Sequence, residues 1–128
     1  MNIGEASEAS GLPAKTIRYY EDIGLIRPMR EANGYRRFTR AEVARLVLLR
    51  RARALGFTVE ECRELLSLYE DEHRHAGEVR AIARERLAAV DARIAELQAL
   101  RRQLSALVAA CSGGPGSRCA ILDELSHD

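Results

Sequence analysis

A long stretch near the end of the chain places the strongest constraint on the fold. Between about residues 75 and 110 there is no proline, and no glycine follows Gly77. A helix of roughly 33 residues is about 50 Å long, more than a small domain can cover. Apolar residues recur along it mostly at steps of three and four, the spacing of one helix face: Ile82, Leu87, Val90, Ile94, Leu97, Leu100, Leu104 and Leu107.

Such an apolar stripe predicts a packing partner. An antiparallel coiled coil between two copies of the chain is the natural one, because a stripe sustained over more than three heptads needs an equally long surface to cover it. The alternative is that the helix packs on the helices earlier in its own chain. A homodimer is therefore our prediction.

The composition favours a mainly α protein of modest size. With 128 residues, the chain fits one compact domain or a small domain with an extended element. Charged residues make up 30% and aromatic residues 5%, with no tryptophan, which suits helices with solvated faces better than a sheet sandwich. A large catalytic architecture is not expected at this length.

Two short helices joined by a tight turn are predicted at the N-terminus. The first spans residues 3–10, and Gly11 and Pro13 end it because glycine allows a left-handed cap and proline cannot continue the helix. The second spans residues 14–23 and stops at Gly24, which makes a helix-turn-helix candidate. Its side chains divide between two sides: Ile17, Tyr20 and Ile23 on one, and Lys15, Arg18 and Tyr19 on the other.

A basic β-hairpin is predicted over residues 25–38. Asn33-Gly34 is a strong hairpin signal because both residues can adopt positive φ. A basic hairpin directly after a helix-turn-helix indicates a wing. Thr39 and Thr58 each stand three residues before a glutamate, the capping-box pattern that opens a helix, so two more helices are predicted, the first ending at Gly56.

The charges are distributed unevenly along the chain. Residues 1–56 carry 11 Lys and Arg against 6 Asp and Glu, whereas residues 57–128 carry 9 against 13. The basic half is the candidate anion-binding part. The alternative is that these residues only form solvated helix faces.

Two cysteines bracket a short loop after the long helix. Cys111 and Cys119 enclose a Gly- and Pro-rich segment that supplies turns and backbone amides but little buried area. No signal peptide or membrane-spanning stretch is evident, so a cytoplasmic location and reduced thiols are expected. Those thiols are available for metal or redox chemistry, whereas Cys62 has no spaced cysteine partner and is interpreted as a buried structural residue.

Several motifs in order along the chain strongly resemble the MerR family of bacterial transcription regulators. The tail, with Ile121 beyond the second cysteine, is similar to the copper-efflux branch of that family. The motifs that carry the resemblance are Ile3-Gly4-Glu5-Ala6, Thr16-Ile17-Arg18-Tyr19-Tyr20-Glu21, Gly24-Leu25-Ile26, Asn33-Gly34-Tyr35-Arg36 and Leu49 through Gly56-Phe57.

The resemblance implies a winged helix-turn-helix DNA-binding domain over residues 1–70, a linker and dimerisation helix over 71–110, and a metal-binding loop and tail over 111–128. It implies a homodimer on a pseudo-palindromic operator, where bound metal distorts the DNA so that RNA polymerase can use the promoter. The expected DNA-contacting residues are Lys15, Thr16, Arg18, Tyr19, Tyr20, Arg30, Tyr35, Arg36 and Arg37. Tyr20 is equally compatible with a place in the core.

The resemblance also implies Cu(I) as the ligand of Cys111 and Cys119, with Ag(I) or Au(I) as alternatives. Soft thiolates favour Cu(I), and a two-coordinate site suits a monovalent ion better than Zn(II), which ordinarily takes four ligands. Divalent-metal members carry a third cysteine where this chain has Ala76. His75 beside it and His127 near the C-terminus are interpreted as packed or solvated residues in preference to ligands.

Two other functions compete with the copper sensor. One is a divalent-metal sensor that uses His75 or water as a further ligand, and the other is a redox sensor in which Cys111 and Cys119 form a disulfide. An enzyme is not expected, because the sequence has no phosphate-binding loop and no pairing of nucleophile with base.

Overall fold

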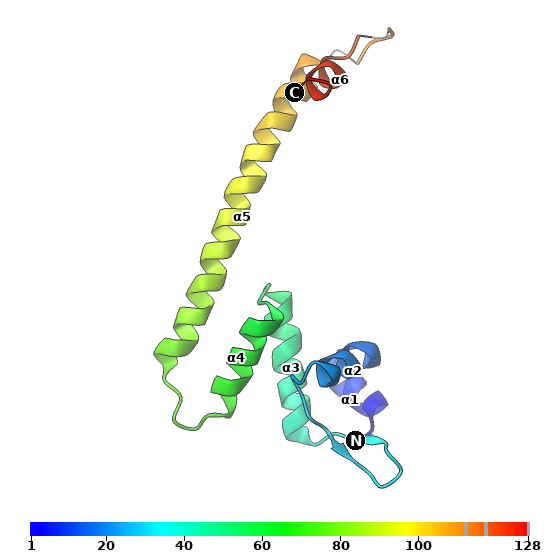
Figure 1. Ribbon diagram of the computed structural model, residues 1–128, viewed down its shortest axis with the longest axis vertical. Helices are drawn as coiled ribbons and strands as arrows, with labels where there is room; N and C mark the ends of the chain where they lie inside the picture. The colour runs from blue at the N-terminus through cyan, green and yellow to red at the C-terminus, as the bar shows by residue number, and fades with distance from the viewer. Residues whose placement is uncertain (112, 117, 128) are drawn as a thin grey trace. The chain divides into compact units, whose positions relative to one another are not determined.

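The computed structural model describes residues 1–111, 113–116 and 118–127. The chain forms two compact units, Met1–Arg86 and Leu87–Asp128. Figure 1 shows the order of the elements, which are helical except for one short hairpin. In chain order they are α1 (Ile3–Ser10), α2 (Ala14–Asp22), β1 (Met29–Arg30), β2 (Arg36–Arg37), α3 (Arg40–Ala54), α4 (Val59–Glu70), α5 (Ala76–Ala110) and α6 (Ala120–Leu125).

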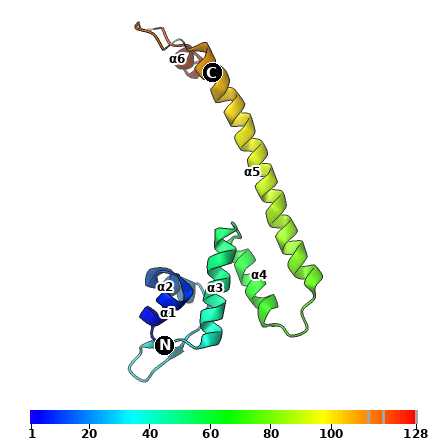
Figure 2. The same cartoon turned by 180° about the vertical axis from the view of Figure 1, so that it is seen from behind.

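The first unit is built around a helix-turn-helix. α1 packs on both α2 and α3, and α3 packs on α4, an arrangement that can be followed from both sides in Figures 1 and 2. Gly11 ends α1 with a φ of 79°, the left-handed conformation that glycine adopts without strain. The predicted helix-turn-helix is therefore confirmed with boundaries within one residue of those expected.

One hydrophobic core joins the helices of this unit. It is formed by side chains from α1, α2, α3, α4 and the start of α5, together with residues of the connecting segments. Its largest fully buried apolar members are Phe38, Ile17, Leu46, Leu49 and Cys62. The core thus fixes α2 against the rest of the unit and sets which of its faces remains exposed.

The hairpin after α2 is antiparallel, with Met29 opposite Arg37 and Arg30 opposite Arg36. Its turn differs from the expected one, because only Gly34 has a positive φ, at 85°, and Asn33 does not. The Gly34 N–H donates to the Glu31 carbonyl at 2.9 Å, and the Glu31 N–H donates to the Tyr35 carbonyl at 2.9 Å. These bonds close a longer turn than the two-residue Asn-Gly loop, which leaves strands of only two residues.

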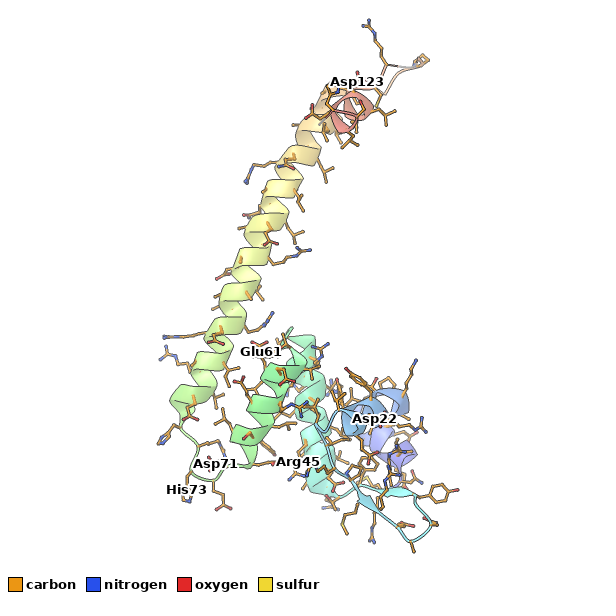
Figure 3. The ribbon with its side chains drawn as sticks, in the orientation of Figure 1. Asp22, Arg45, Glu61, Asp71, His73 and Asp123 are labelled. Carbon is orange, nitrogen blue, oxygen red and sulfur yellow. The ribbon has the colours of Figure 1, made fainter. Side chains whose placement is uncertain are left out.

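Capping boxes open α3 and α4 as predicted. The side chains of Thr39 and Thr58 accept hydrogen bonds from the N–H groups of Glu42 and Glu61 respectively, and each glutamate carboxylate accepts one from the N–H of its threonine. Glu61, labelled in Figure 3, also binds Arg86 of α5, with 3.1 Å between Oε1 and Nη2. The start of α5 is thereby attached to the first unit.

The second unit contains the rest of α5 and α6. No residue described between Leu87 and His127 is buried. The leucine stripe predicted to need a partner is exposed here, with Leu97 at 49% and Leu104 at 61%. The sequence predicted a metal-binding loop and tail over residues 111–128 without a helix, whereas the structure forms the six-residue α6 there. Among the described residues, no helix is long and apolar enough to cross a membrane.

Candidate nucleic-acid interface and metal site

The second helix of the helix-turn-helix separates core side chains from exposed ones. Ile17 is fully buried, whereas Lys15 and Arg18 are exposed and Tyr19 is 51% exposed. Thr16 is half-buried between the two groups. The exposed face therefore presents two cations and an aromatic ring, the side-chain types that contact phosphates and bases in a DNA groove.

Tyr20 does not belong to this exposed face. The sequence prediction placed it among the DNA-contacting residues, but its side chain is only 5% exposed and packs in the core. Burial raises the pKa of its hydroxyl, an effect that the nearby Arg53 guanidinium opposes. The sequence left the core and the DNA surface equally open for Tyr20, and the structure favours the core, on the side of the helix that Ile17 shares with it.

The hairpin presents a second basic surface. Tyr35 is 71% exposed in the turn, and Arg37 on β2 is exposed. Arg36 is half-buried, with 20% of its side chain exposed, and its Nε donates to Glu21 at 2.6 Å. Arg30 also donates to Glu21, at 2.9 Å from Nη2.

An open groove of about 890 Å³ lies among the hairpin, α2 and the start of the chain. Arg18 of the helix lines it together with basic and aromatic groups of the hairpin, so the two elements share one concave face. The lining residues are Met1, Asn2, Ile3, Glu5, Arg18, Glu31, Gly34, Tyr35, Arg36 and Arg37.

Two arginines of α3 and α4 bind backbone carbonyls within the fold. Arg50 of α3 donates to the Ser10 carbonyl at the end of α1, at 2.8 Å. Arg63 of α4 donates to the Ile23 carbonyl after α2, at 3.0 Å. Both bonds join residues 40 apart and satisfy carbonyls that helix ends leave unpaired. No local sequence pattern distinguishes these arginines from those on exposed faces.

The two loop cysteines lie at the facing ends of two helices. The Cys111 N–H donates to the Leu107 carbonyl and so continues the last turn of α5. Cys119 is the N-cap residue of α6, and its carbonyl accepts from the Asp123 N–H at 3.0 Å. Figure 3 labels Asp123 on this short helix.

The thiols of Cys111 and Cys119 are 3.9 Å apart, and both are free and half-buried. The backbone N–H of Leu122 lowers the pKa of the Cys119 thiol, and the Cys111 thiol and the Ile121 N–H act in the same direction. The thiolate, which is the form that binds metals, is thereby favoured at this position.

This geometry fits a metal ion held by two sulfurs. Both sulfurs can reach one ion at about 2.3 Å, the zinc–thiolate bond length. A linear arrangement needs the two sulfurs to move apart by less than about 1 Å from their distance of 3.9 Å. Within residues 1–111, 113–116 and 118–127, no group of three or more His, Cys, Asp and Glu side chains could hold a metal. Ser112 and Ser117 of the loop lie outside the described residues.

The remaining thiol and imidazoles are placed as follows. Cys62 is fully buried in the core of the first unit, where burial raises its pKa. His75 and Ala76 are exposed at the start of α5. His127 has its Nδ1 2.6 Å from the Asp123 carbonyl oxygen.

The fold and these sites define a winged helix-turn-helix DNA-binding protein with a long exposed helix and a thiol pair. Two family descriptions match the chain: "MerR HTH family regulatory protein" over residues 1–68 and "MerR, DNA binding" over residues 43–107. The chain belongs to the MerR family.

Similar proteins match over nearly the whole chain. The transcriptional regulator HmrR of Rhizobium leguminosarum bv. viciae is 60% identical, and the match covers 98% of each chain. CueR of Salmonella typhimurium is 43% identical, over 98% of this chain and 92% of its own. The solved structure of PbrR691 from Ralstonia metallidurans CH34 with lead(II) has 34% identity and a TM-score of 0.88, covering 98% of this chain and 99% of that one.

Membership of this family confirms the helix-turn-helix assignment and the prediction of a regulator. Proteins of the MerR family are transcription regulators and not enzymes, so the expectation of a non-enzyme is also confirmed.

Proposed function

We propose that this protein is a Cu(I)-responsive transcription regulator that binds promoter DNA as a homodimer, with Ag(I) and Au(I) as alternative ligands. The observation that carries the proposal is the pair of free thiols of Cys111 and Cys119, 3.9 Å apart at the end of α5. They stand in a chain whose first unit has the fold of a DNA-binding regulator.

The choice of metal rests on the donor set. Thiolates are soft ligands that select Cu(I), whereas structural Zn(II) sites ordinarily need four protein ligands. Ala76 stands where the divalent-metal members that the chain resembles carry a third cysteine, and it offers no side-chain donor. A bound ion would join the end of α5 to the start of α6 through Cys111 and Cys119.

The DNA surface in this proposal combines the second helix with the hairpin. A helix-turn-helix presents this helix to the major groove, while basic wing residues contact phosphates. Lys15, Arg18 and Tyr19 are exposed on α2, and Thr16 lies at their edge. Arg30, Tyr35, Arg36 and Arg37 supply the hairpin contacts.

The homodimer rests on the exposed face of α5. Its C-terminal half carries an open apolar groove of about 540 Å³, lined by Leu97, Leu100, Arg101, Leu104, Ser105, Val108 and Ala109. A contiguous apolar face of this kind is costly in water, and a second copy can cover it along the whole helix. Two copies would also present two recognition helices, which is what a pseudo-palindromic operator requires.

The response would work by changing the shape of the operator. Metal binding stabilises one of two conformations by its difference in affinity for them. In that conformation the dimer distorts the promoter so that RNA polymerase can use it, and genes for copper efflux or resistance are transcribed. DNA deformability supplies the energetic link between the two states.

Anaerobic titration of the reduced protein tests the proposal. Cu(I) is added against a competing chelator, with Zn(II) in a parallel series, and both series are repeated with Cys111→Ser and Cys119→Ser. We expect one Cu(I) per subunit, at least 100-fold weaker binding in each variant because one of the two ligands is lost, and no comparable binding of Zn(II).

Cys62→Ala is the matched control, because it removes a thiol that lies in the core of the other unit. It should retain one Cu(I) per subunit. Both loop variants should still bind the DNA duplex that the wild-type protein selects from a random pool, yet lose metal-induced transcription. Tight zinc binding with weak copper binding would contradict the monovalent assignment and favour a divalent sensor.

A thiol–disulfide sensor is the second candidate, and the distance between the two thiols supports it. From 3.9 Å the sulfurs need to approach to about 2.05 Å to form the bond. A disulfide such as oxidised glutathione would accept the two electrons, with both protons passing to the thiols it releases. Thiol titration after exposure to that oxidant separates the two functions, because a metal sensor needs its thiols reduced.

A further inference from the structure

Glu21 joins the helix and the hairpin of the candidate DNA surface. It lies in the last turn of α2, and one oxygen of its carboxylate accepts from both Arg30 and Arg36, at 2.9 Å and 2.6 Å. Only 17% of the Glu21 side chain is exposed, so these charge-assisted bonds are partly shielded from water. One carboxylate therefore connects the second helix to both strands of the hairpin.

The hairpin needs such a connection. Arg30 and Arg36 are direct partners in the antiparallel register, and like charges opposite each other destabilise a strand pair. Each strand has only two residues, and an isolated two-stranded hairpin is marginally stable. Arg30 also donates from Nη1 to the Gly34 carbonyl in the turn at 2.8 Å. The Glu21 carboxylate thus neutralises a repulsion at the base of the turn.

The same bonds set the position of the groove. Arg36 uses its Nε to bind Glu21, and it lines the groove together with Arg18 and Tyr35. If Arg36 is fixed to α2, the basic groups of hairpin and helix keep one spacing. A duplex would then meet both surfaces without first ordering the hairpin, which lowers the entropic cost of binding.

We propose that Glu21 is a positioning residue for DNA binding, which locks the hairpin to the second helix so that both contact the duplex together. This inference rests on the proposed DNA surface. Charge alone predicts the opposite effect on DNA affinity, because a carboxylate near DNA repels phosphates and its removal should strengthen binding.

The test compares Glu21→Gln with Glu31→Gln. Glu31 lines the same groove and is exposed, so its substitution removes the same charge without touching the two arginines. The probe is the duplex that full-length wild-type protein enriches from a random-sequence pool. Affinity is measured at several salt concentrations, because the slope of log K against log salt counts phosphate contacts.

We expect Glu21→Gln to weaken binding about fivefold and to lower the salt slope by about one to two contacts, while Glu31→Gln binds as tightly as wild type or slightly tighter. Amide hydrogen exchange at Glu31 and Gly34, whose N–H groups close the turn, should accelerate in Glu21→Gln. Glu21→Ala removes both hydrogen bonds, and alanine is a good helix former that preserves α2, so this variant should give a larger effect of the same kind.

Each other outcome overturns the inference in a distinguishable way. Unchanged or tighter binding by Glu21→Gln would mean that only its charge matters. Weaker binding with an unchanged salt slope would mean a loss of folded protein and not of contacts. Equal weakening by Glu31→Gln would remove any special role for Glu21. If the wild-type protein enriched no duplex, the proposed DNA-binding function itself would fail.

Discussion

The two units of the chain use apolar residues in opposite ways. In Met1–Arg86 they converge from four helices, the start of α5 and the connecting segments on one core. In Leu87–Asp128 they line one face of α5 and are exposed, as at Leu97 and Leu104. The first unit has a hydrophobic core of its own, whereas the second has a stripe that only another molecule or segment can cover. The folding of the first unit and the proposed dimerisation thus depend on different parts of the chain.

The largest effect is expected from breaking the exposed stripe. The double substitution Leu97→Glu and Leu104→Glu would place charges on facing helices of the proposed dimer, so it should yield a monomer and weaken operator binding more than about 100-fold. Light scattering gives the molecular mass, and duplex titration gives the affinity.

Gln98→Glu adds a charge beside the stripe on the same helix and serves as the control. It should remain dimeric and bind normally. A double variant that stayed dimeric would show that a different surface holds the two copies together.

The second effect concerns the core of the first unit. Leu46→Ala should destabilise the protein by about 2–5 kcal/mol, because Leu46 is fully buried and its removal leaves a cavity. Leu55→Ala removes the same atoms where the side chain is 69% exposed and should cost less than about 0.5 kcal/mol. Denaturant unfolding at one fixed protein concentration measures both. Equal losses would contradict the difference in packing between these positions.

The smallest effect concerns the contact between α4 and α5. The Thr58 N–H lowers the pKa of the Glu61 carboxyl, assisted by the Thr58 hydroxyl and Arg86. The ionised carboxylate therefore stabilises the fold fully above its ordinary pKa, and this contribution disappears as pH falls through the lowered value. Glu61→Gln should reduce stability at neutral pH but flatten its loss toward acid.

Glu64→Gln removes an exposed carboxyl from the same helix and is the matched control. It should keep the acid dependence of the wild type. The measurement is unfolding free energy from pH 7 downward. An identical acid profile for Glu61→Gln and the wild type would contradict a role for this carboxylate.

Local patterns predicted the helices and their ends. Gly11 and Gly24 end helices with positive φ, and Thr39 and Thr58 cap the next two, all through groups within a few residues of one another. The absence of proline between about residues 75 and 110, together with the apolar spacing within them, also predicted α5 to within one residue of its start. Such features depend on short-range geometry that the sequence contains directly.

The tail was predicted less completely. The cysteine spacing identified a candidate ligand pair, but α6 after it was not expected. A six-residue helix is too short for a periodic pattern, and Cys119 caps it without a side-chain hydrogen bond. The distance of 3.9 Å between the sulfurs required the structure of both helix ends.

The sequence by itself determined that this chain is a MerR-family helix-turn-helix protein with a long helix and two loop thiols, because those properties follow from local spacing and motifs. Tertiary structure decided which charged and aromatic residues are exposed and which ones are used in contacts within the fold. Tyr20 became a core residue, Arg63 binds a carbonyl 40 residues away, and Glu21 holds Arg30 against Arg36. Those roles depend on contacts between distant segments, and a side chain's charge does not reveal its partner.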